Sequence, residues 1–163
     1  MSRHDLDRRA FLLGASLIAL GASPAAAAAD AYANSPFRKI SDAEWKKRLS
    51  GPAYRVLRHE DTERPGTSPL LDEHRKGTFV CAACDLPLFR SEWKYESGTG
   101  WPSFFRVIPG AVGQKTDFKI GIPRTEYHCA RCLGHQGHVF EDGPKPTGLR
   151  YCNNGLALKF VPA

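Results

Sequence analysis

The sequence of 163 residues lacks the features that mark several large classes of protein. Its main apolar run, residues 12–22, is shorter than the roughly 20 residues that a membrane-spanning helix needs. No run of lysine and arginine is longer than residues 46–48, so the net charge of +6 indicates a solvated basic surface and not a nucleic-acid site. No internal repeat is present, and residues 78–161 show no helical periodicity. What remains is the pattern of a single globular domain.

The first 33 residues have the features of an export leader. Arg8 and Arg9 precede a weakly apolar stretch, and five alanines then provide small residues suited to cleavage after Ala29 or Ala33. This order resembles a twin-arginine signal; the alternatives are a frayed amphipathic terminus and an uncleaved anchor. We therefore expect a bacterial periplasmic protein with its mature domain at residues 34–163 and no stable membrane insertion.

Helical signals occur only near the start of this domain. Ser41 followed by Glu44 is a capping box, which predicts a short helix that runs through Leu49. The Gly-Pro pair at residues 51–52 is expected to end it, and a second helical turn is expected at residues 53–58. The N-terminal end of the domain is therefore predicted to be helical.

The rest of the domain reads as loops and strands. Residues 61–75 are polar and interrupted by prolines, which predicts a loop with little chemistry and with its histidine, like His59, on the surface. Beyond it, short β-like runs alternate with Gly and Pro turns, a pattern typical of antiparallel β structure. The predicted strands are residues 78–81, 88–89, 104–108, 119–122, 126–129, 138–140 and 156–161.

Four of the five cysteines form two C-x2-C pairs, Cys81 with Cys84 and Cys129 with Cys132. Two such turns brought together make the tetrahedral four-sulfur cage that zinc prefers. Two disulfides are the alternative, but a C-x2-C disulfide closes a very small loop and constrains the unfolded chain little. The spacing therefore favours one zinc ion, and four thiolates leave it no open position, so its role is structural.

The fifth cysteine, Cys152, stands outside these pairs and close to Arg150. The attacking species in thiol chemistry is the thiolate, and a neighbouring cation lowers the pKa of a cysteine. His135 and His138 supply candidate proton donors a short distance upstream. The pattern favours a nucleophile with its acid, and the alternative is a small buried thiol without reactivity.

A glycine-rich turn around Trp101 is the remaining feature. Glycines allow close approach of the backbone, so a tryptophan held there can present its face to a ligand methyl group or pack in the core. With residues 137–140 and 150–154, this turn makes the sequence resemble the B-type methionine-R-sulfoxide reductases over about residues 37–162. The resemblance implies a mainly β fold of two small antiparallel sheets with short N-terminal helices and a four-cysteine zinc site.

The resemblance also implies roles for individual residues. Cys152 matches the nucleophile, which would attack the sulfoxide sulfur and become a sulfenic acid. The substrates would be oxidised proteins or peptides, with the free amino acid as an alternative, and the activity would be the repair of oxidative damage. The other matched positions are His135 and His138 as active-site histidines, Trp101 as the methyl-facing indole, Phe140 as a pocket wall, Arg150 and Asn154 as polar neighbours of the nucleophile, and Cys81, Cys84, Cys129 and Cys132 as zinc ligands.

Three positions depart from the family pattern. Thr99 stands where many members have a resolving cysteine, Gly155 where a serine is usual, and Gln136 where an apolar residue is usual. With no second free thiol in the chain, we expect a thioredoxin-like protein to reduce the sulfenic acid directly. We also expect a monomer that does not bind nucleic acid. The alternative function is a non-catalytic zinc-binding β module for protein or nucleic-acid recognition.

Overall fold

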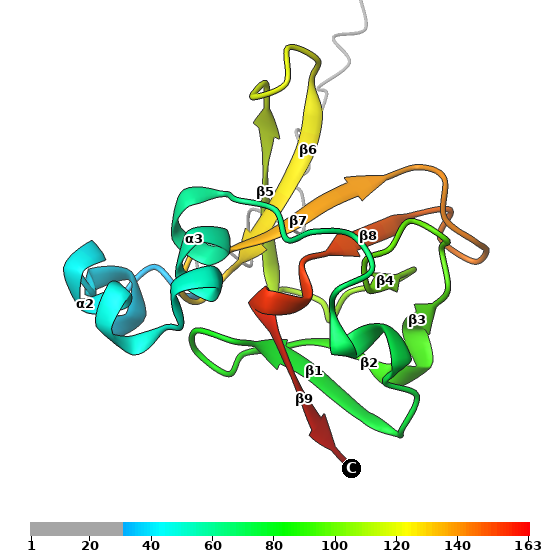
Figure 1. Ribbon diagram of the computed structural model, residues 1–163, viewed down its shortest axis with the longest axis horizontal. Coiled ribbons are helices and arrows are strands. Elements are labelled where there is room, and N and C mark those ends of the chain that lie inside the picture. The colour runs from blue at the N-terminus through cyan, green and yellow to red at the C-terminus, as the bar shows by residue number, and fades with distance from the viewer. Residues whose placement is uncertain (1–30) are drawn as a thin grey trace, which may run out of the picture.

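The computed structural model describes residues 31–163 of the chain (Figure 1). The predicted leader at residues 1–33 lies outside the described residues except for its last three. Within residues 31–163, no helix is long and apolar enough to cross a membrane.

Two short helices open the described chain, α2 at Asp42–Arg48 and α3 at Gly51–His59. The predicted cap is present, because Ser41 Oγ accepts a hydrogen bond from Glu44 N–H at 3.3 Å. The role assigned to Gly51 and Pro52 was wrong: they begin α3 behind the cap residue Ser50, since a proline is well tolerated in the first turn of a helix.

A three-stranded sheet has the order β2, β1, β9, with all neighbours antiparallel. The strands are β1 at Gly77–Cys81, β2 at Pro87–Arg90 and β9 at Leu158–Pro162. The chain therefore brings its C-terminal strand back beside the first strand of the domain (Figure 1).

A six-stranded antiparallel sheet has the order β3, β4, β8, β7, β6, β5. Its strands are β3 at Lys94–Tyr95, β4 at Ser103–Phe104, β5 at Val112–Asp117, β6 at Arg124–Cys129, β7 at His135–Phe140 and β8 at Arg150–Asn153. The predicted fold class, mainly β with two antiparallel sheets and short N-terminal helices, is confirmed.

The strand predictions failed in two places. Residues 119–122 are not a strand but part of the turn between β5 and β6, where Gly121 adopts a left-handed φ of 83° that suits glycine. The strand predicted at residues 104–108 ends at Phe104. The sequence pattern also missed β3, β5 and β8. The polar residues of β5 show no apolar alternation.

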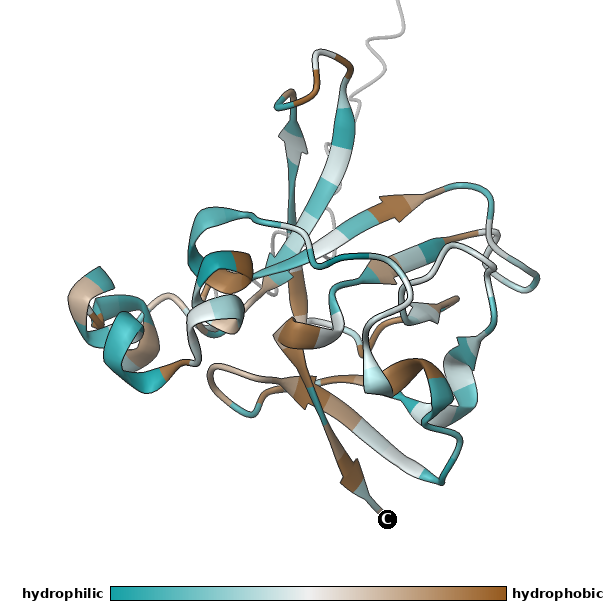
Figure 2. Ribbon diagram, in the orientation of Figure 1, coloured by the Kyte–Doolittle hydropathy of each residue, from teal (hydrophilic) through white to brown (hydrophobic). Residues whose placement is uncertain are grey.

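The core lies between the two sheets and is rich in aromatic rings. Phe89 of the smaller sheet stacks on Phe104 of the larger one with ring centroids 4.1 Å apart. Tyr127 and Tyr151 pack edge to face against each other nearby, at 5.3 Å. Figure 2 shows hydrophobic residues concentrated along β1 and β9 of the smaller sheet. Because Tyr151 points into the core, the adjacent residue Cys152 must point to the opposite face of β8.

Candidate active site and metal site

Strand register gathers the predicted catalytic residues on the outer face of the larger sheet. Cys152 on β8 lies directly opposite His138 on β7 and opposite Ser103 on β4. Directly opposed residues in an antiparallel pair share a face, with Cβ atoms roughly 4.5–5.5 Å apart. The thiol and the imidazole are therefore neighbours although fourteen positions separate them in the sequence.

A pocket of about 130 Å³ opens over this face, and Cys152 is half-buried within it. Its walls include four other residues that the sequence analysis selected, namely Trp101, His138, Phe140 and Asn154. The remaining lining residues are Thr62, Arg124, Gly137 and Asn153. The structure thus brings five of the seven predicted catalytic and substrate-binding residues to one cavity.

The other two, His135 and Arg150, lie next to the pocket and do not line it. The His135 ring is buried with its centroid 5.5 Å from that of His138. The Arg150 guanidinium lies 4.3 Å above the Phe140 ring and forms an ion pair with Asp142 at 2.7 Å. Arg150 therefore fixes a wall of the pocket by a cation–π contact as well as placing positive charge near the thiol.

Burial has the largest effect on the pKa of the Cys152 thiol. It raises the pKa of Cys152 above its ordinary value, while Arg150 and the Thr99 hydroxyl act in the opposite direction. Arg150 thus acts in the expected direction, but the cost of burying a thiolate exceeds the attraction of the guanidinium.

His138 is held by an acidic partner. Its Nε2 lies 2.7 Å from Asp117 Oδ2, and Arg124 donates to the same oxygen at 2.5 Å. Burial lowers the pKa of His138, while the Asp117 carboxylate acts to raise it. With Nε2 committed to Asp117, the second ring nitrogen, Nδ1, is the one left for proton exchange.

His135 is held by a different carboxylate. Glu126 accepts from His135 Nδ1 at 2.7 Å and from His128 Nδ1 at 3.1 Å. Burial raises the pKa of Glu126, but these two imidazoles outweigh it and lower the pKa to about 2. Glu126 therefore stays ionised and fixes the orientation of His135 behind His138.

Glu63, which the sequence analysis did not identify, is hydrogen-bonded to two residues that line the pocket. The Trp101 indole N–H donates to the Glu63 carbonyl at 3.1 Å, and the Glu63 N–H donates to Asn154 Oδ1 at 3.0 Å. The Glu63 carboxylate accepts from the backbone N–H groups of Gly155 and Leu156. The prediction of little chemistry in residues 61–75 was wrong, and no local motif could have revealed these long-range contacts.

Two departures from the family pattern have structural explanations. A Cβ atom at Gly155 would lie 1.9 Å from Ser68 Oγ, so a hydroxyl from the 61–75 segment fills the space that a side chain at 155 would need. The Gln136 side chain is buried, and its Nε2 lies 3.5 Å from Cys81 Sγ, to which it donates. Gln136 thus supplies an N–H to one thiol of the paired cysteines.

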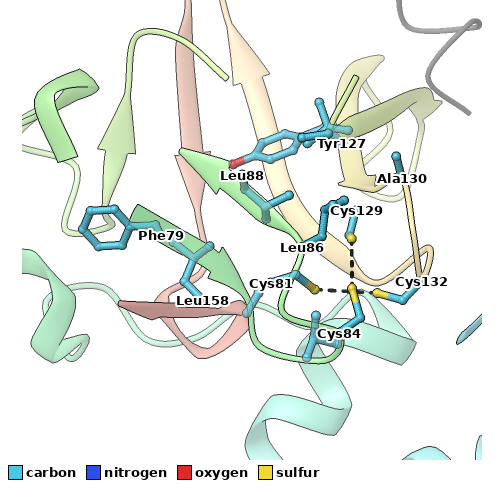
Figure 3. Close-up of a cluster of buried hydrophobic side chains, with 14 of the residues drawn as sticks. Phe79, Cys81, Cys84, Leu86, Leu88, Tyr127, Cys129, Ala130, Cys132 and Leu158 are labelled. Carbon is cyan, nitrogen blue, oxygen red and sulfur yellow. Dashed lines mark hydrogen bonds between the residues drawn. The ribbon is translucent and has the colours of Figure 1, made fainter. Parts of the chain in front are cut away.

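The four paired cysteines converge as predicted (Figure 3). Their sulfur atoms are buried and all lie within 4.8 Å of one another, with Cys81 to Cys132 at 3.6 Å and Cys84 to Cys129 at 3.5 Å. A tetrahedral site with metal–sulfur bonds of about 2.3 Å requires sulfur–sulfur separations of about 3.8 Å. None of these cysteines is in a disulfide. The cluster can therefore hold a metal ion.

The surrounding chain holds the cluster rigidly. Each C-x2-C turn is followed by a residue in the left-handed region, Asp85 at φ 57° and Leu133 at φ 61°. Arg58 on α3 donates to the carbonyl of Cys132 at 3.0 Å, so the helix is fastened to the second turn. The cluster joins the two sheets, because the first pair begins at the last residue of β1 and the second at the last residue of β6.

Comparison with known proteins agrees with this geometry. Residues 49–162 match the model of the SelR domain. The peptide methionine sulfoxide reductase MsrB of Agrobacterium fabrum is 51% identical over 129 residues, which cover 78% of this chain and 96% of that protein. The proteins of the same name from Leptospira interrogans and Methanosarcina barkeri are 53% and 51% identical, covering 74% of this chain and 92% and 85% of theirs. The chain therefore belongs to the MsrB family of peptide methionine sulfoxide reductases.

Proposed function

We propose that this chain is a peptide-methionine (R)-S-oxide reductase that repairs oxidised proteins, with Cys152 as its nucleophile. The observation that carries the proposal is the pocket in which the Cys152 thiol, the His138 imidazole and the Trp101 indole meet. A thiol, a proton donor and an aromatic surface are the three groups that the reaction requires.

The chemistry is a two-electron exchange between two sulfur atoms. The Cys152 thiolate attacks the sulfoxide sulfur, the oxygen is transferred to the cysteine, and a proton completes the products, methionine and a sulfenic acid. His138 donates a proton to the departing oxygen, and His135 behind it, held by Glu126, supports its orientation.

The other pocket residues select and orient the substrate. The Trp101 face receives the methyl group, and Phe140, held by Arg150, forms the opposing apolar wall. Asn154 and Arg150 are polar groups beside the nucleophile. A pocket that fixes both the methyl group and the oxygen of a chiral sulfoxide accepts one hand, which we assign as R.

The sulfenic acid is reduced by an external thiol, such as that of a thioredoxin-like protein. Thr99 Oγ1 lies 4.0 Å from Cys152 Sγ, so the position next to the nucleophile carries a hydroxyl and not a second thiol. The other four cysteines are engaged in the buried cluster. The incoming thiolate displaces hydroxide from the sulfenic acid to form a mixed disulfide, and the hydroxide takes up a proton and leaves as water. A second external thiol then releases Cys152.

The metal of the four-cysteine cluster is one zinc ion with a structural role. The buried set of four sulfurs within 4.8 Å of one another supports this assignment, because zinc prefers four thiolates, which leave no position for substrate. Residues 1–33 direct the protein to the periplasm, where its reductant must draw electrons from across the membrane.

A turnover assay on peptides that contain resolved R or S sulfoxides, with a dithiol reductant, tests the function directly. We expect reduction of the R form only and its loss in C152S, with folding and zinc content unchanged. A sulfenic-acid probe should label Cys152 when substrate is present without reductant. If C152S keeps full activity, or if neither epimer is reduced, the reductase assignment fails and a non-catalytic zinc-binding module becomes the better description.

A further inference from the structure

The turn between β5 and β6, residues 118–123, exposes a cluster of large apolar side chains. Phe118 is 65% exposed, and Ile120 and Ile122 are each 59% exposed. They are three of the five large apolar residues that are exposed within residues 31–163. Figure 2 shows the tip of this hairpin as hydrophobic at the end of mostly hydrophilic strands. Apolar side chains gathered in this way mark interaction surfaces, whereas single exposed ones do not.

Hydrogen bonds hold this hairpin tip in place. Asp117 pairs with Arg124 across its base, and Asp117 Oδ1 accepts from the Lys119 N–H at 2.7 Å. The Lys119 ammonium donates to the carbonyl of Glu60 at 3.0 Å, which fastens the turn to the segment after α3. The apolar side chains are therefore presented at a fixed position relative to the pocket.

The hairpin tip is continuous with the pocket at Cys152. Three residues line both that pocket and an adjoining hollow, namely Thr62, Arg124 and His138. The hollow extends to Ile120. The pocket of about 130 Å³ is smaller than the roughly 300–1,000 Å³ of pockets that enclose whole small molecules. It accommodates one side chain, so the polypeptide on either side of that side chain must cross the rim.

We propose that the hairpin tip binds apolar side chains that flank the methionine sulfoxide in an extended segment of an oxidised protein, which deepens and rests on the proposed function. The hollow between the pocket and the tip is lined by four carboxylates, of Glu60, Asp61, Asp117 and Glu126, and by the cations Lys119 and Arg124. Asp117 pairs with Arg124 and Glu126 pairs with His135, so the exposed apolar side chains of the tip are the feature that distinguishes this surface. Folded proteins bury their apolar residues, so this surface favours substrates that are unfolded or locally opened.

The test compares the wild type with the variant F118S/I120S/I122S on three substrates. These are N-acetyl methionine sulfoxide amide, a peptide with leucine and phenylalanine beside the sulfoxide, and the same peptide with serine in their place. We expect kcat/KM of the apolar peptide to fall roughly tenfold in the variant, mainly through KM, because apolar burial is lost. Activity on the small amide and on the serine peptide should be unchanged. V161S, which alters an exposed apolar residue on β9, is the matched control.

The outcomes separate this proposal from the function on which it rests. If the wild type reduces the two peptides equally well, or if the triple variant keeps the preference, the hairpin tip is not a substrate surface. If the wild type is a dimer in gel filtration and the variant a monomer, a second copy of the chain covers the tip and the proposal is overturned. Failure to reduce even the small amide would instead reject the reductase function.

A second inference comes from a chain of hydroxyl groups that ends at the nucleophile. Ser97 Oγ lies 2.8 Å from Thr99 Oγ1 and 2.7 Å from Ser103 Oγ, and Ser103 donates to the carbonyl of Trp101 at 3.1 Å. Thr99 Oγ1 lies 4.0 Å from Cys152 Sγ, a separation that can close when the sulfur becomes charged. The chain therefore connects the thiol to a backbone carbonyl through three rotatable donors.

We infer that this hydroxyl chain reverses direction when Cys152 ionises, and that Thr99 is a catalytic residue that stabilises the thiolate. In the thiol state each hydroxyl hydrogen points away from the sulfur, and the hydroxyl of Ser103 donates to the Trp101 carbonyl. In the thiolate state Ser103 donates to Ser97, Ser97 to Thr99, and Thr99 to the sulfur. The proton lost by the sulfur passes to water or to a base in the pocket, so no group of the chain itself gains one.

The pH dependence of Cys152 alkylation by iodoacetamide tests this inference, with zinc-loaded protein and with C152S as the background. T99V should raise the apparent pKa of Cys152 and slow its alkylation roughly tenfold at neutral pH, because a hydrogen bond to a charged group is lost. T99S should match the wild type, and S97A should shift the profile less, in the same direction. The charged and titratable groups around Cys152, which these variants leave unchanged, are Arg150, Asp142, His138, Tyr95 and Tyr127. An unchanged profile in T99V, or an equal shift in T99S, would refute the role of the hydroxyl.

Discussion

The chain uses cysteine in two contrasting environments. Four cysteines are buried together at the junction of the two sheets, where each sulfur has other sulfurs as neighbours; they are Cys81, Cys84, Cys129 and Cys132. Cys152 is half-buried on the outer face of the larger sheet, where its neighbours are an indole, an imidazole and a hydroxyl. The comparison teaches that residues of one chemical type are given different capacities by their surroundings, which control how readily a thiol ionises.

The two regions are nevertheless connected through one residue of β7. The Gln136 side chain donates to Cys81 Sγ in the cluster, and its backbone carbonyl accepts from the backbone and side-chain N–H groups of Asn154 in the pocket. The same strand carries His135 and His138 on either side of it. Loss of the cluster is therefore expected to disturb the pocket, whereas changes in the pocket should leave the cluster intact.

Removal of one sulfur from the cluster should have the largest effect. We expect C84S to lose the metal and to unfold at least about 10 °C below the wild type, because structural zinc contributes folding free energy directly. Its reductase activity should be lost with the fold. The measurements are thermal unfolding by circular dichroism and zinc content by mass spectrometry. The matched variant C152S should keep the unfolding temperature and the zinc content of the wild type. A C84S protein with wild-type stability would show that the cluster is not a metal site.

Introduction of a thiol beside the nucleophile should change the fate of the oxidised enzyme. In T99C, the substrate should drive formation of a disulfide between the new thiol and Cys152, since the wild-type side chains are within 4.0 Å. Non-reducing peptide mapping after one turnover would detect the crosslink, and a sulfenic-acid probe should no longer label the protein. T99S serves as the control and should retain the label. Persistent labelling of T99C would show that the two side chains do not meet in solution.

Loss of the carboxylate beneath His135 should have a moderate effect on stability. At neutral pH, E126Q should be less stable by about 2 kcal/mol, because a buried charged acceptor is removed from two imidazoles. The pKa of Glu126 is lowered from 4.5 to about 2 on folding, so its contribution is present above pH 4.5 and is lost as the pH falls toward 2. Urea unfolding at several pH values should show the difference between wild type and variant shrinking as the pH decreases. A constant difference would contradict this assignment.

Substitution of the connecting residue should have the smallest effect on stability. Q136L removes the N–H donor to Cys81 but also removes Gln136 Oε1, which has no hydrogen-bond partner, so the change in unfolding free energy should stay within about 1 kcal/mol. The metal should be released roughly tenfold faster to a chelator, since the donor that supports the ligand is absent. A chelator-based colour assay measures the release rate. Release at the wild-type rate would show that Gln136 does not support the cluster.

Features with a local cause could be predicted from the sequence. The Ser41 cap, the two C-x2-C turns and most strands follow from residues a few positions apart, and all are present. Strands β3, β5 and β8 were not predicted. The polar residues of β5 are held by pairing with β6 and not by their own preference. Glu63 was missed for a similar reason, since its partners Trp101 and Asn154 lie far along the chain.

By itself, the sequence determined the mainly β fold, the four cysteines that can hold a metal ion and most of the residues from which the pocket is built, because spacing and residue type carry that information. The tertiary structure alone decided how those residues act together. It placed His138 across from Cys152, left His135 behind it, and raised the pKa of the thiol above its ordinary value. Register and burial are properties of the packed sheets, and the free energy of a buried charge depends on every group that surrounds it.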